Sequence, residues 1–381
     1  MLRDRRFWQI AIQIIAVILV LIFIAVIGSN LNANLQQLGI KLGFDFLGTQ
    51  ASFDIGESII NYDPSNSFAQ AMLVGLVNSL RIMAIGLITS TIVGLTVGIA
   101  RLSDNWLVRN LAMIYVEVLR NTPLLLQLFF WYFAVFISLP KIESNAQFSN
   151  PFYFFTNQGI AIPWIASNSN TGLWLILLTV GILASAWLWR WRVKIRVETG
   201  EAGRQFLWAS SAILLTVIIA LIITQNLPFT LDIPHITENL ELEGGLKLTP
   251  EFTTLLTGLT LYTASFIAEI VRAGIQSVPK GQWEAGKALG LKSGLMMQLV
   301  ILPQALRVIV PPLTSQYLNL AKNSSLAIAI GYPDVYFVAS TTFNQTGRAV
   351  EVMLLIIIIY LTISLVIAIA MNLYNRSVQL K

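Results

Sequence analysis

Residues 278–303, VPKGQWEAGKALGLKSGLMMQLVILP, form a stretch rich in polar and small residues between two apolar runs, each long enough to cross a bilayer. Ser277 is expected to cap a short helix at the start of this stretch. Gly290 is expected to make a left-handed turn that ends this helix. A second short helix should follow from about Lys292 to Leu299, until Pro303 ends the pattern. The stretch therefore predicts a helical segment outside the lipid, which is called the elbow below.

One side of the first elbow helix is expected to carry small residues. Ala285, Ala288 and Leu289 share this side, because residues three and four apart are neighbours on a helix. Trp283 and Gly286 lie close to it. A small-residue face with a bulky anchor fits a shallow groove on another protein, so the elbow is predicted to be a docking element; the alternative is an ordinary loop between two spans.

The spacing of the elbow matches a known motif. Glu284-Ala285-Gly286, three residues, Gly290, nine residues and Val300-Ile301-Leu302-Pro303 resemble the EAA loop of bacterial ABC importer permeases, which docks onto the ATPase subunit. Gly286 stands where the third residue of the motif is usually alanine; glycine loosens a helix by about 1 kcal/mol but keeps the face small. The resemblance implies that the elbow couples this chain to an ATPase through Trp283, Glu284, Ala285, Gly286, Ala288, Leu289 and Gly290.

The composition is that of a membrane protein. Apolar residues make up 56% of the chain and charged residues 11%, whereas about a quarter of the residues of a soluble domain are charged. The absence of cysteine excludes disulfide scaffolds, thiolate metal sites and cysteine nucleophiles. A single histidine, His235, argues against a histidine-based metal site, so no metal ligand is predicted. The net charge of +5 is better explained by its distribution across a bilayer than by binding to nucleic acid.

Apolar runs predict eight membrane helices and an all-α polytopic fold. The first run could be a signal peptide, but it is longer than a usual apolar core and no clear cleavage site follows it. The expected spans are Ile10–Ile27, Leu80–Ala100, Leu111–Leu139, Leu173–Trp189, Leu207–Thr224, Thr253–Gln276, Ala305–Ala321 and Val352–Leu373.

Basic residues are unevenly divided between the segments that join these spans. Of the 24 Lys and Arg residues, 17 fall in the two termini and in the three connections assigned to the same side. Because cytoplasmic segments are enriched in Lys and Arg, both ends of the chain are predicted to be cytoplasmic, and so is the elbow.

Two spans carry the same pair of ionisable residues. Glu117 and Arg120, and Glu269 and Arg272, are spaced so that each pair lies on one helix face. A charge that faces lipid costs about 3 kcal/mol or more, so both pairs are expected to face protein or a wet cavity and to neutralise each other. Two roles stay open, a structural salt bridge between helices and a part in gating. Pro123 is expected to kink the third span.

The resemblance extends beyond the elbow. RNTPLLLQLFFWYF (residues 120–133) and LPQALRVIVPPLTSQYLNLAKNSSLAIAIGYPD (302–334) look like permeases of the polar amino acid ABC uptake family. GFDFLGTQASFDI (43–55) and NQGIAIPW (157–164) are similar to its general L-amino-acid branch, although Gln158 stands where that branch is expected to have arginine.

The resemblance implies a core of five helices, the second, third, sixth, seventh and eighth spans. It divides the chain into a first helix with an outer loop (1–70), the first part of the core (71–139), an insertion with two spans (140–250) and the second part of the core with the elbow (251–381).

The resemblance also implies an activity. This chain would be the permease subunit of an inner-membrane importer that works by alternating access, in which the cavity opens first to one side of the membrane and then to the other. Its partners would be an ATP-binding subunit dimer, a second, related permease chain and a periplasmic amino-acid-binding protein. No GxxxxGK[ST] motif occurs, so the chain is predicted not to be an enzyme and to bind no cofactor, with ATP and Mg²⁺ held by the partner.

A polar cluster near the outer end of the seventh span could contact the solute. Lys322 is a candidate for the carboxylate of an amino acid, and neighbouring amides and hydroxyls for its ammonium group; the other reading is a lysine that reaches for the interface. The candidate residues are Asn319, Lys322, Asn323 and Ser324.

Two other classes of function stay open. An ion-coupled secondary transporter would need broken helices near the midplane and would work without an ATPase. A non-transporting membrane scaffold would use the Glu and Arg pairs only to hold helices together.

Overall fold

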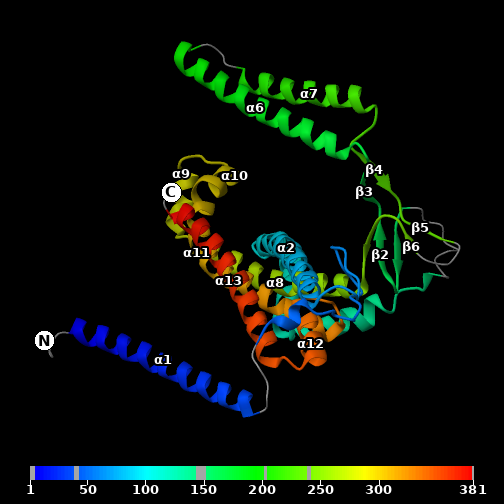
Figure 1. The fold of residues 1–381 in the computed structure, drawn as a ribbon. Helices are drawn as coiled ribbons and strands as arrows, with labels where there is room; N and C mark the ends of the chain where they lie inside the picture. The colour runs from blue at the N-terminus through cyan, green and yellow to red at the C-terminus, as the bar shows by residue number, and fades with distance from the viewer. Residues whose placement is uncertain (1–4, 38–42, 143–151, 201–203, 238–241, 380–381) are drawn as a thin grey trace. The chain divides into compact units, whose positions relative to one another are not determined.

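The computed structural model describes residues 5–37, 43–142, 152–200, 204–237 and 242–379 (Figure 1). It contains seven helices that are long and apolar enough to cross a membrane, and a bent helix pair that would make an eighth span. Seven of the eight predicted spans therefore correspond to a helix that could cross a membrane, and the predicted third span coincides with the bent pair. Three basic residues that entered the charge count, Arg3, Lys41 and Lys381, lie outside the described residues.

Helices make up most of the described chain. They are α1 (Arg5–Gln37), α2 (Phe68–Ala100), α3 (Trp106–Asn121), α4 (Leu124–Phe129), α6 (Thr171–Thr199), α7 (Gln205–Thr224), α8 (Pro250–Gln276), α9 (Lys280–Ala288), α10 (Ser293–Met296), α11 (Leu302–Asn323), α12 (Val335–Thr346) and α13 (Ala349–Gln379), with shorter 3₁₀ or π-helical turns η1 (Asp45–Gly48), η2 (Phe130–Phe136), η3 (Met297–Ile301) and η4 (Ser324–Ile330).

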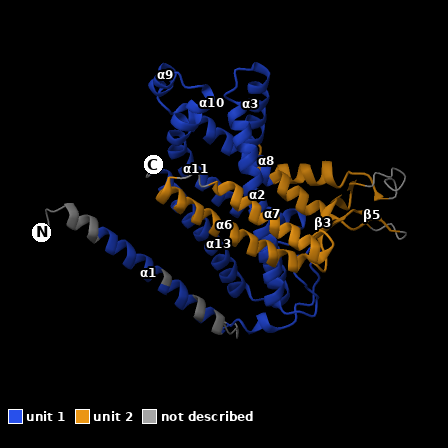
Figure 2. Cartoon of the chain, turned by 90° about the horizontal axis from the view of Figure 1, so that it is seen from above, with its two compact units in different colours: residues 1–121, 259–381 blue, residues 122–258 orange. Residues whose placement is uncertain are grey.

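The chain divides into two compact units, coloured separately in Figure 2. The first consists of residues 1–121 and 259–381, and the second of residues 122–258. The elbow, and most of the residues predicted to be functional, belong to the first unit.

In the first unit, α2 packs closely on α8 through a stripe of small residues. Gly94 and Gly98, one turn apart, are buried and lie against Ile267 and Val271 of α8, whereas Gly86, two turns before Gly94, lies against Leu320 of α11. A Cβ atom at Gly94 would lie 2.6 Å from the Cβ of Ile267 on α8, so only glycine fits at this contact. Small residues at this spacing let the backbones of two membrane helices approach each other closely.

Polar contacts join α8 to other helices of the same unit. The hydroxyl of Tyr115 on α3 donates a hydrogen bond of 2.8 Å to the carbonyl of Leu261. Thr89 of α2 and Thr260 of α8 share a hydrogen bond of 2.6 Å. These bonds join the part of α8 that lies in the first unit to α2 and α3.

The segment before α2 folds back onto the helix ends that lie opposite the elbow. Phe46 packs in one buried cluster with Phe68 of α2 and with residues of α12 and α13. The backbone N–H of Gly43 donates to Glu351 in the first turn of α13, at 3.2 Å. Glu57 pairs with Arg81 of α2 at 2.5 Å. These contacts fix the segment to three helices.

The second unit contains short strands that the sequence analysis did not predict. Strand β2 (Gly159–Ile162) pairs antiparallel with β1 (Phe154–Thr156) and β7 (Leu246–Leu248). Two further antiparallel pairs are β3 (Trp164–Ser167) with β4 (Phe229–Asp232), and β5 (His235–Ile236) with β6 (Leu242–Glu243). The pairs β2–β7 and β3–β4 therefore join the two segments that flank the α6–α7 hairpin, whereas β1–β2 and β5–β6 each lie within one segment.

Candidate functional site

The elbow begins directly after α8. Pro279, in an extended conformation, is the N-cap of α9, and no side chain caps the helix. The prediction that Ser277 caps this helix is wrong, because its hydroxyl donates to the carbonyl of Gly274 at 2.7 Å. Ser277 thus belongs to the last turn of α8.

The left-handed turn at Gly290 is confirmed. Gly290 has φ +71°, a conformation that L side chains rarely adopt. Around this turn the N–H of Leu291 donates to the carbonyl of Gly286 at 3.1 Å, which closes the C-terminal end of α9. The backbone therefore favours glycine at this position.

The prediction that Pro303 ends the helical pattern is wrong. The chain runs as one helical segment from Ser293 to Ile330, with Pro303 in the first turn of α11. Proline lacks an N–H and its ring clashes with the carbonyl four residues earlier. The preceding π-helical turn η3 is wider than an α-helical turn, and this relieves the clash without a break.

The two sides of α9 have different surroundings. Trp283 is half-buried and packs with Met296 in the buried cluster below the elbow, which also contains residues of α8 and α11. Gly286 is buried, and a Cβ atom there would lie 3.0 Å from the side chain of Met296. This contact explains glycine at the position where the EAA loop usually has alanine.

The opposite side of α9 is exposed. The side chains on it belong to Glu284, Ala285, Ala288 and Leu289, and Leu289 is 79% exposed. Leu289 therefore lies next to the small side chains of Ala285 and Ala288 with most of its surface uncovered. These four residues are called the outer elbow face below.

Glu269 is held by two arginines near the elbow end of α8. Arg272 donates to it from Nε at 3.1 Å and from Nη2 at 2.5 Å. Arg101, at the end of α2, donates to the same carboxylate from Nη1. The predicted Glu269–Arg272 pair is therefore confirmed. The sequence analysis missed Arg101, which makes the pair a link between α2 and α8.

The prediction that Glu117 and Arg120 pair with each other is wrong. Glu117 is exposed, and the side-chain amide of Asn121 donates to its carboxylate at 3.4 Å. The guanidinium of Arg120 lies over the ring of Phe266 on α8, 5.1 Å from the ring centre. Pro123 is the N-cap of α4, at a bend of 107° between α3 and the following helical segment, so the predicted kink is confirmed.

The polar cluster at the end of α11 lies partly on an exposed stripe. Asn319 and Lys322 are exposed, as is Ser315 one turn earlier, which the sequence analysis did not select. Asn323 is half-buried, whereas Ser324 is buried and its hydroxyl donates to the carbonyl of Ala321 at 2.9 Å. Two of the four candidate residues are thus open to a solute on the same helix face.

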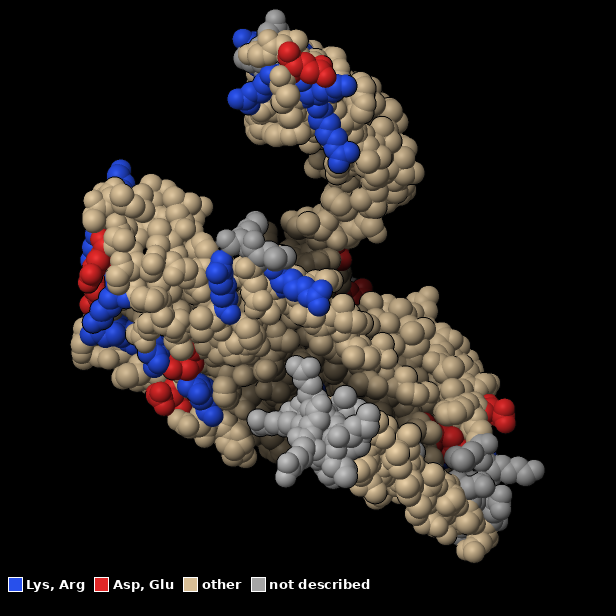
Figure 3. Space-filling view, turned by 90° about the vertical axis from the view of Figure 1, so that its left-hand side faces the viewer, with Lys and Arg blue, Asp and Glu red and all other residues tan. Residues whose placement is uncertain are grey.

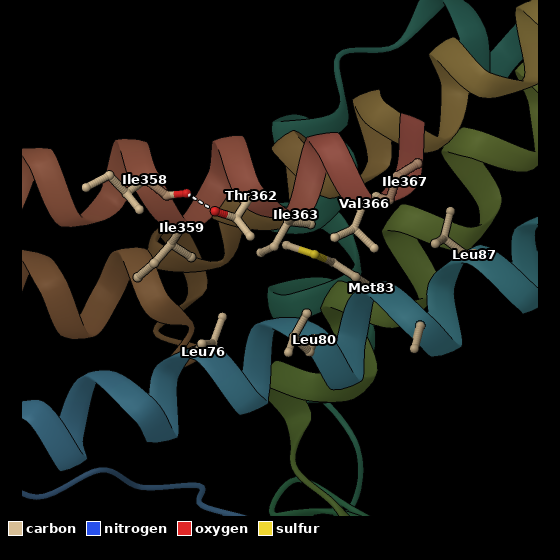
Figure 4. Close-up of a pocket in the computed structure, with 11 residues that line it drawn as sticks. Leu76, Leu80, Met83, Leu87, Ile358, Ile359, Thr362, Ile363, Val366 and Ile367 are labelled. Atoms are coloured by element: carbon tan, nitrogen blue, oxygen red, sulfur yellow. Dashed lines mark hydrogen bonds between the residues drawn. The ribbon is translucent and has the colours of Figure 1, made fainter. Parts of the chain in front are cut away.

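An apolar groove of the first unit is a poor solute site. It has a volume of about 450 Å³ and lies between α2 and α13 (Figure 4). Thr362 is the one polar residue in its lining, and its hydroxyl donates to the carbonyl of Ile358 within α13 at 2.7 Å. Nothing in this lining could bind the charged groups of a polar solute.

Comparisons with known proteins place the sequence in a transport family. Residues 86–380 match the family described as "Binding-protein-dependent transport system inner membrane component". This match covers both the elbow and the helices that contact it.

Similar proteins cover almost the whole chain. It is 40% identical to the general L-amino acid transport system permease protein AapQ of Rhizobium johnstonii, over 99% of this chain and 94% of that protein. It is 42% identical to the putative amino-acid ABC transporter permease protein YhdX of Escherichia coli, over 96% of this chain and 93% of that protein. It is 41% identical to the glutamate/glutamine/aspartate/asparagine transport system permease protein BztB of Rhodobacter capsulatus, over 99% of this chain and 95% of that protein.

Proposed function

The chain belongs to the family of inner membrane components of binding-protein-dependent transport systems, and from this membership we propose that it is the permease subunit of an ATP-driven amino-acid importer. The names of its similar proteins support amino acids as the solute class. The single observation that carries the proposal is the exposed outer elbow face, which stands beside a buried cluster joining α8 to α11.

We propose that a separate ATPase subunit docks on the outer elbow face. Small side chains at Ala285 and Ala288 let another surface approach the helix, and the exposed Leu289 supplies apolar area for it. Glu284 adds a charge that a basic residue of the ATPase would pair with. ATP and Mg²⁺ would be bound by that subunit.

Movement of the ATPase would reach the membrane helices through the inner side of α9. Trp283 and Met296 pack against the same cluster as Ile275 of α8 and Ile309 of α11, so a displaced elbow moves both helices. The link from Glu269 to Arg101 extends this movement to α2. Close-packed interiors transmit such displacements because they are not continuously deformable.

The exposed polar stripe of α11 is the proposed solute contact. Lys322 would bind the carboxylate of the amino acid, with Ser315 and Asn319 as hydrogen-bonding groups along the same face. Polar residues in a membrane span almost always face the bundle interior or a wet cavity, which supports a place for this stripe beside the pathway.

The proposed assembly has four kinds of component. Two permease chains, this one and a related partner, would enclose the pathway, an ATPase dimer would bind the two elbows, and a periplasmic amino-acid-binding protein would deliver the solute. The chain would lie in the bacterial inner membrane with both termini in the cytoplasm, as the distribution of basic residues predicts.

Reconstitution of the complex tests this proposal. We expect ATP hydrolysis by the purified complex to be stimulated by particular amino acids in the presence of the binding protein, and labelled solute to accumulate only when ATP is supplied. Uptake by this chain alone, driven by an ion gradient, would instead indicate a secondary transporter. A complex that neither binds an ATPase nor moves solute would indicate a scaffold.

A further inference from the structure

The hairpin of α6 and α7 in the second unit carries a basic and aromatic cluster at its loop end. Helix α6 has 29 residues and α7 has 20, which correspond to lengths of about 44 and 30 Å. The hydrocarbon core of a bilayer is about 30 Å thick, so α6 extends beyond it. The extension is at the loop end, where Arg190, Arg192, Lys194 and Arg196 follow the last long apolar run of the helix.

Close packing fixes the hairpin along its length. The indole N–H of Trp174 donates to the hydroxyl of Thr224 at 3.0 Å near one end. Gly181 lies against Thr216 so closely that a Cβ atom would be 2.6 Å from the threonine hydroxyl. The same antiparallel register brings Arg192 of α6 next to Trp208 in the first turn of α7.

Three tryptophans form an aromatic group at the level of these basic residues. Trp187 and Trp191, one turn apart on α6, stack with ring centres 6.0 Å apart and planes 5° apart. Trp208 and both stacked rings are substantially exposed. Exposed tryptophans at the end of an apolar helix are typical of the bilayer interface, where their rings lie among lipid headgroups.

Arg192 is positioned by two of these rings. The centre of its guanidinium lies 4.3 Å from the ring centre of Trp208 and 5.0 Å from that of Trp191. Its Nε is buried and has no hydrogen-bond partner among the described residues. A planar guanidinium held in this way presents its terminal nitrogens as a fork, which matches two oxygens of a phosphate.

The cluster has an excess of positive charge. Lys194 pairs with Glu198 at 3.7 Å, but in the described chain no carboxylate lies within ion-pair distance of Arg190, Arg192 or Arg196. Figure 3 shows basic side chains gathered at the loop end of the hairpin, uppermost in that view. Arg192 and Arg196 are one turn apart and so lie on the same face of α6.

We propose that the loop end of the α6–α7 hairpin is a binding site for the headgroup of an anionic phospholipid. Arg192 would bind the phosphate between the tryptophan rings, and Arg196 a second negative oxygen one turn further from the hydrocarbon. Basic residues are generally enriched on one side of a membrane, and this enrichment alone explains how many charges lie here. It does not explain why the guanidinium of Arg192 is held by two aromatic rings, whereas a lipid-binding site does.

Retention of lipid by the purified transporter complex tests the proposal. The complex is prepared in mixed micelles of phosphatidylglycerol and phosphatidylcholine, and the lipids that stay bound are identified by native mass spectrometry. We expect the wild type to retain phosphatidylglycerol in preference, and R192Q/R196Q to lose this preference by about tenfold or more, since each basic residue near a membrane surface contributes substantially to binding of anionic lipid.

The matched control removes two basic residues from other helices. R109Q/R376Q has the same change of charge, and we expect it to keep the wild-type preference. Thermal unfolding in phosphatidylcholine alone shows whether R192Q/R196Q is folded. If it is not, R196Q, which changes the exposed arginine of the site, replaces it with R376Q as its control, and we expect a smaller loss of the preference because Arg192 remains. Equal retention of both lipids by the wild type, an unchanged preference in the tested variant, or an equal loss in the control would overturn the proposal.

Discussion

Arg101 at the end of α2 and Glu269 of α8 form an ion pair that joins two helices far apart in the sequence, beside the elbow. Arg272 binds the same carboxylate from within α8. The side chains of Arg101 and Glu269 are 11% and 25% exposed, so the pair is largely shielded from water. The ion pair therefore ties the elbow end of α8 to the end of α2.

Replacement of Glu269 by Gln should destabilise the protein by about 2 kcal/mol, because two partly buried arginines would lose their shared carboxylate. Thermal unfolding of the detergent-solubilised complex measures this loss. Glu117→Gln is the matched control: it changes a second Glu-x-x-Arg motif whose carboxylate is exposed and contacts Asn121. Equal unfolding temperatures for the two variants would argue against the link.

Replacement of Gly94 by Ala should disturb the contact between α2 and α8. The new Cβ atom would lie 2.6 Å from the side chain of Ile267, and overpacking of this kind costs about 1–3 kcal/mol. Gly172→Ala is the control, because no atom lies within 4 Å of its new Cβ. Denaturation of both variants in the same detergent gives the comparison, and a Gly94 variant as stable as the control would contradict the close approach.

The stability of the protein should depend on Asp334 between pH 4 and pH 7. Burial raises the pKa of this carboxyl to about 7, although its Oδ1 accepts a hydrogen bond of 2.8 Å from the N–H of Phe337 and the hydroxyl of Tyr360 lies 3.4 Å from Oδ2. The pKa of Asp334 is higher in the folded than in the unfolded protein. The contribution of its carboxyl group to the free energy of unfolding is therefore fully present below about pH 4 and is lost as pH rises through 7.

The Asn variant of this residue separates the effect of charge from that of helix capping. Asp334→Asn keeps a good N-cap for α12 but cannot ionise, so its unfolding temperature should fall less than that of the wild type from pH 5 to pH 8. The same slope in both proteins would assign the pH dependence to other groups.

Replacement of Lys322 by Met should weaken recognition of the amino-acid carboxylate. Loss of a charge-assisted hydrogen bond predicts about a tenfold higher solute concentration for half-maximal uptake. Lys247→Met, which removes an exposed lysine from β7, is the control and should leave uptake unchanged. A Lys322 variant with unaltered uptake would make this lysine an interfacial anchor.

The sequence predicts most features that depend on local chemistry. The number of spans follows from apolar length, the bend at Pro123 from the missing N–H of proline, and the turn at Gly290 from the freedom of glycine. The elbow residues could be selected because their spacing is that of a known motif. Each of these features is decided by residues close together in the chain.

The remaining features depend on residues distant in sequence. Arg101 could not be assigned to Glu269, because only the fold brings α2 beside α8. Arg120 has the same spacing to a glutamate as Arg272, yet it lies over Phe266, since that ring is within its reach on the neighbouring helix. The short strands were missed because each has only two to four residues, and two of the four described pairings, β2 with β7 and β3 with β4, join segments on either side of two spans.

The central claim is that the outer elbow face couples this chain to an ATPase, and Glu284→Lys tests it most directly. Import of labelled amino acid and ATP hydrolysis are measured together in the reconstituted complex, with Glu198→Lys, an equal charge reversal at an exposed glutamate on α6, as the control. We predict that the Glu284 variant inserts normally but imports far less solute for each ATP hydrolysed, while the control matches the wild type. Unchanged import per ATP in the Glu284 variant would contradict the account.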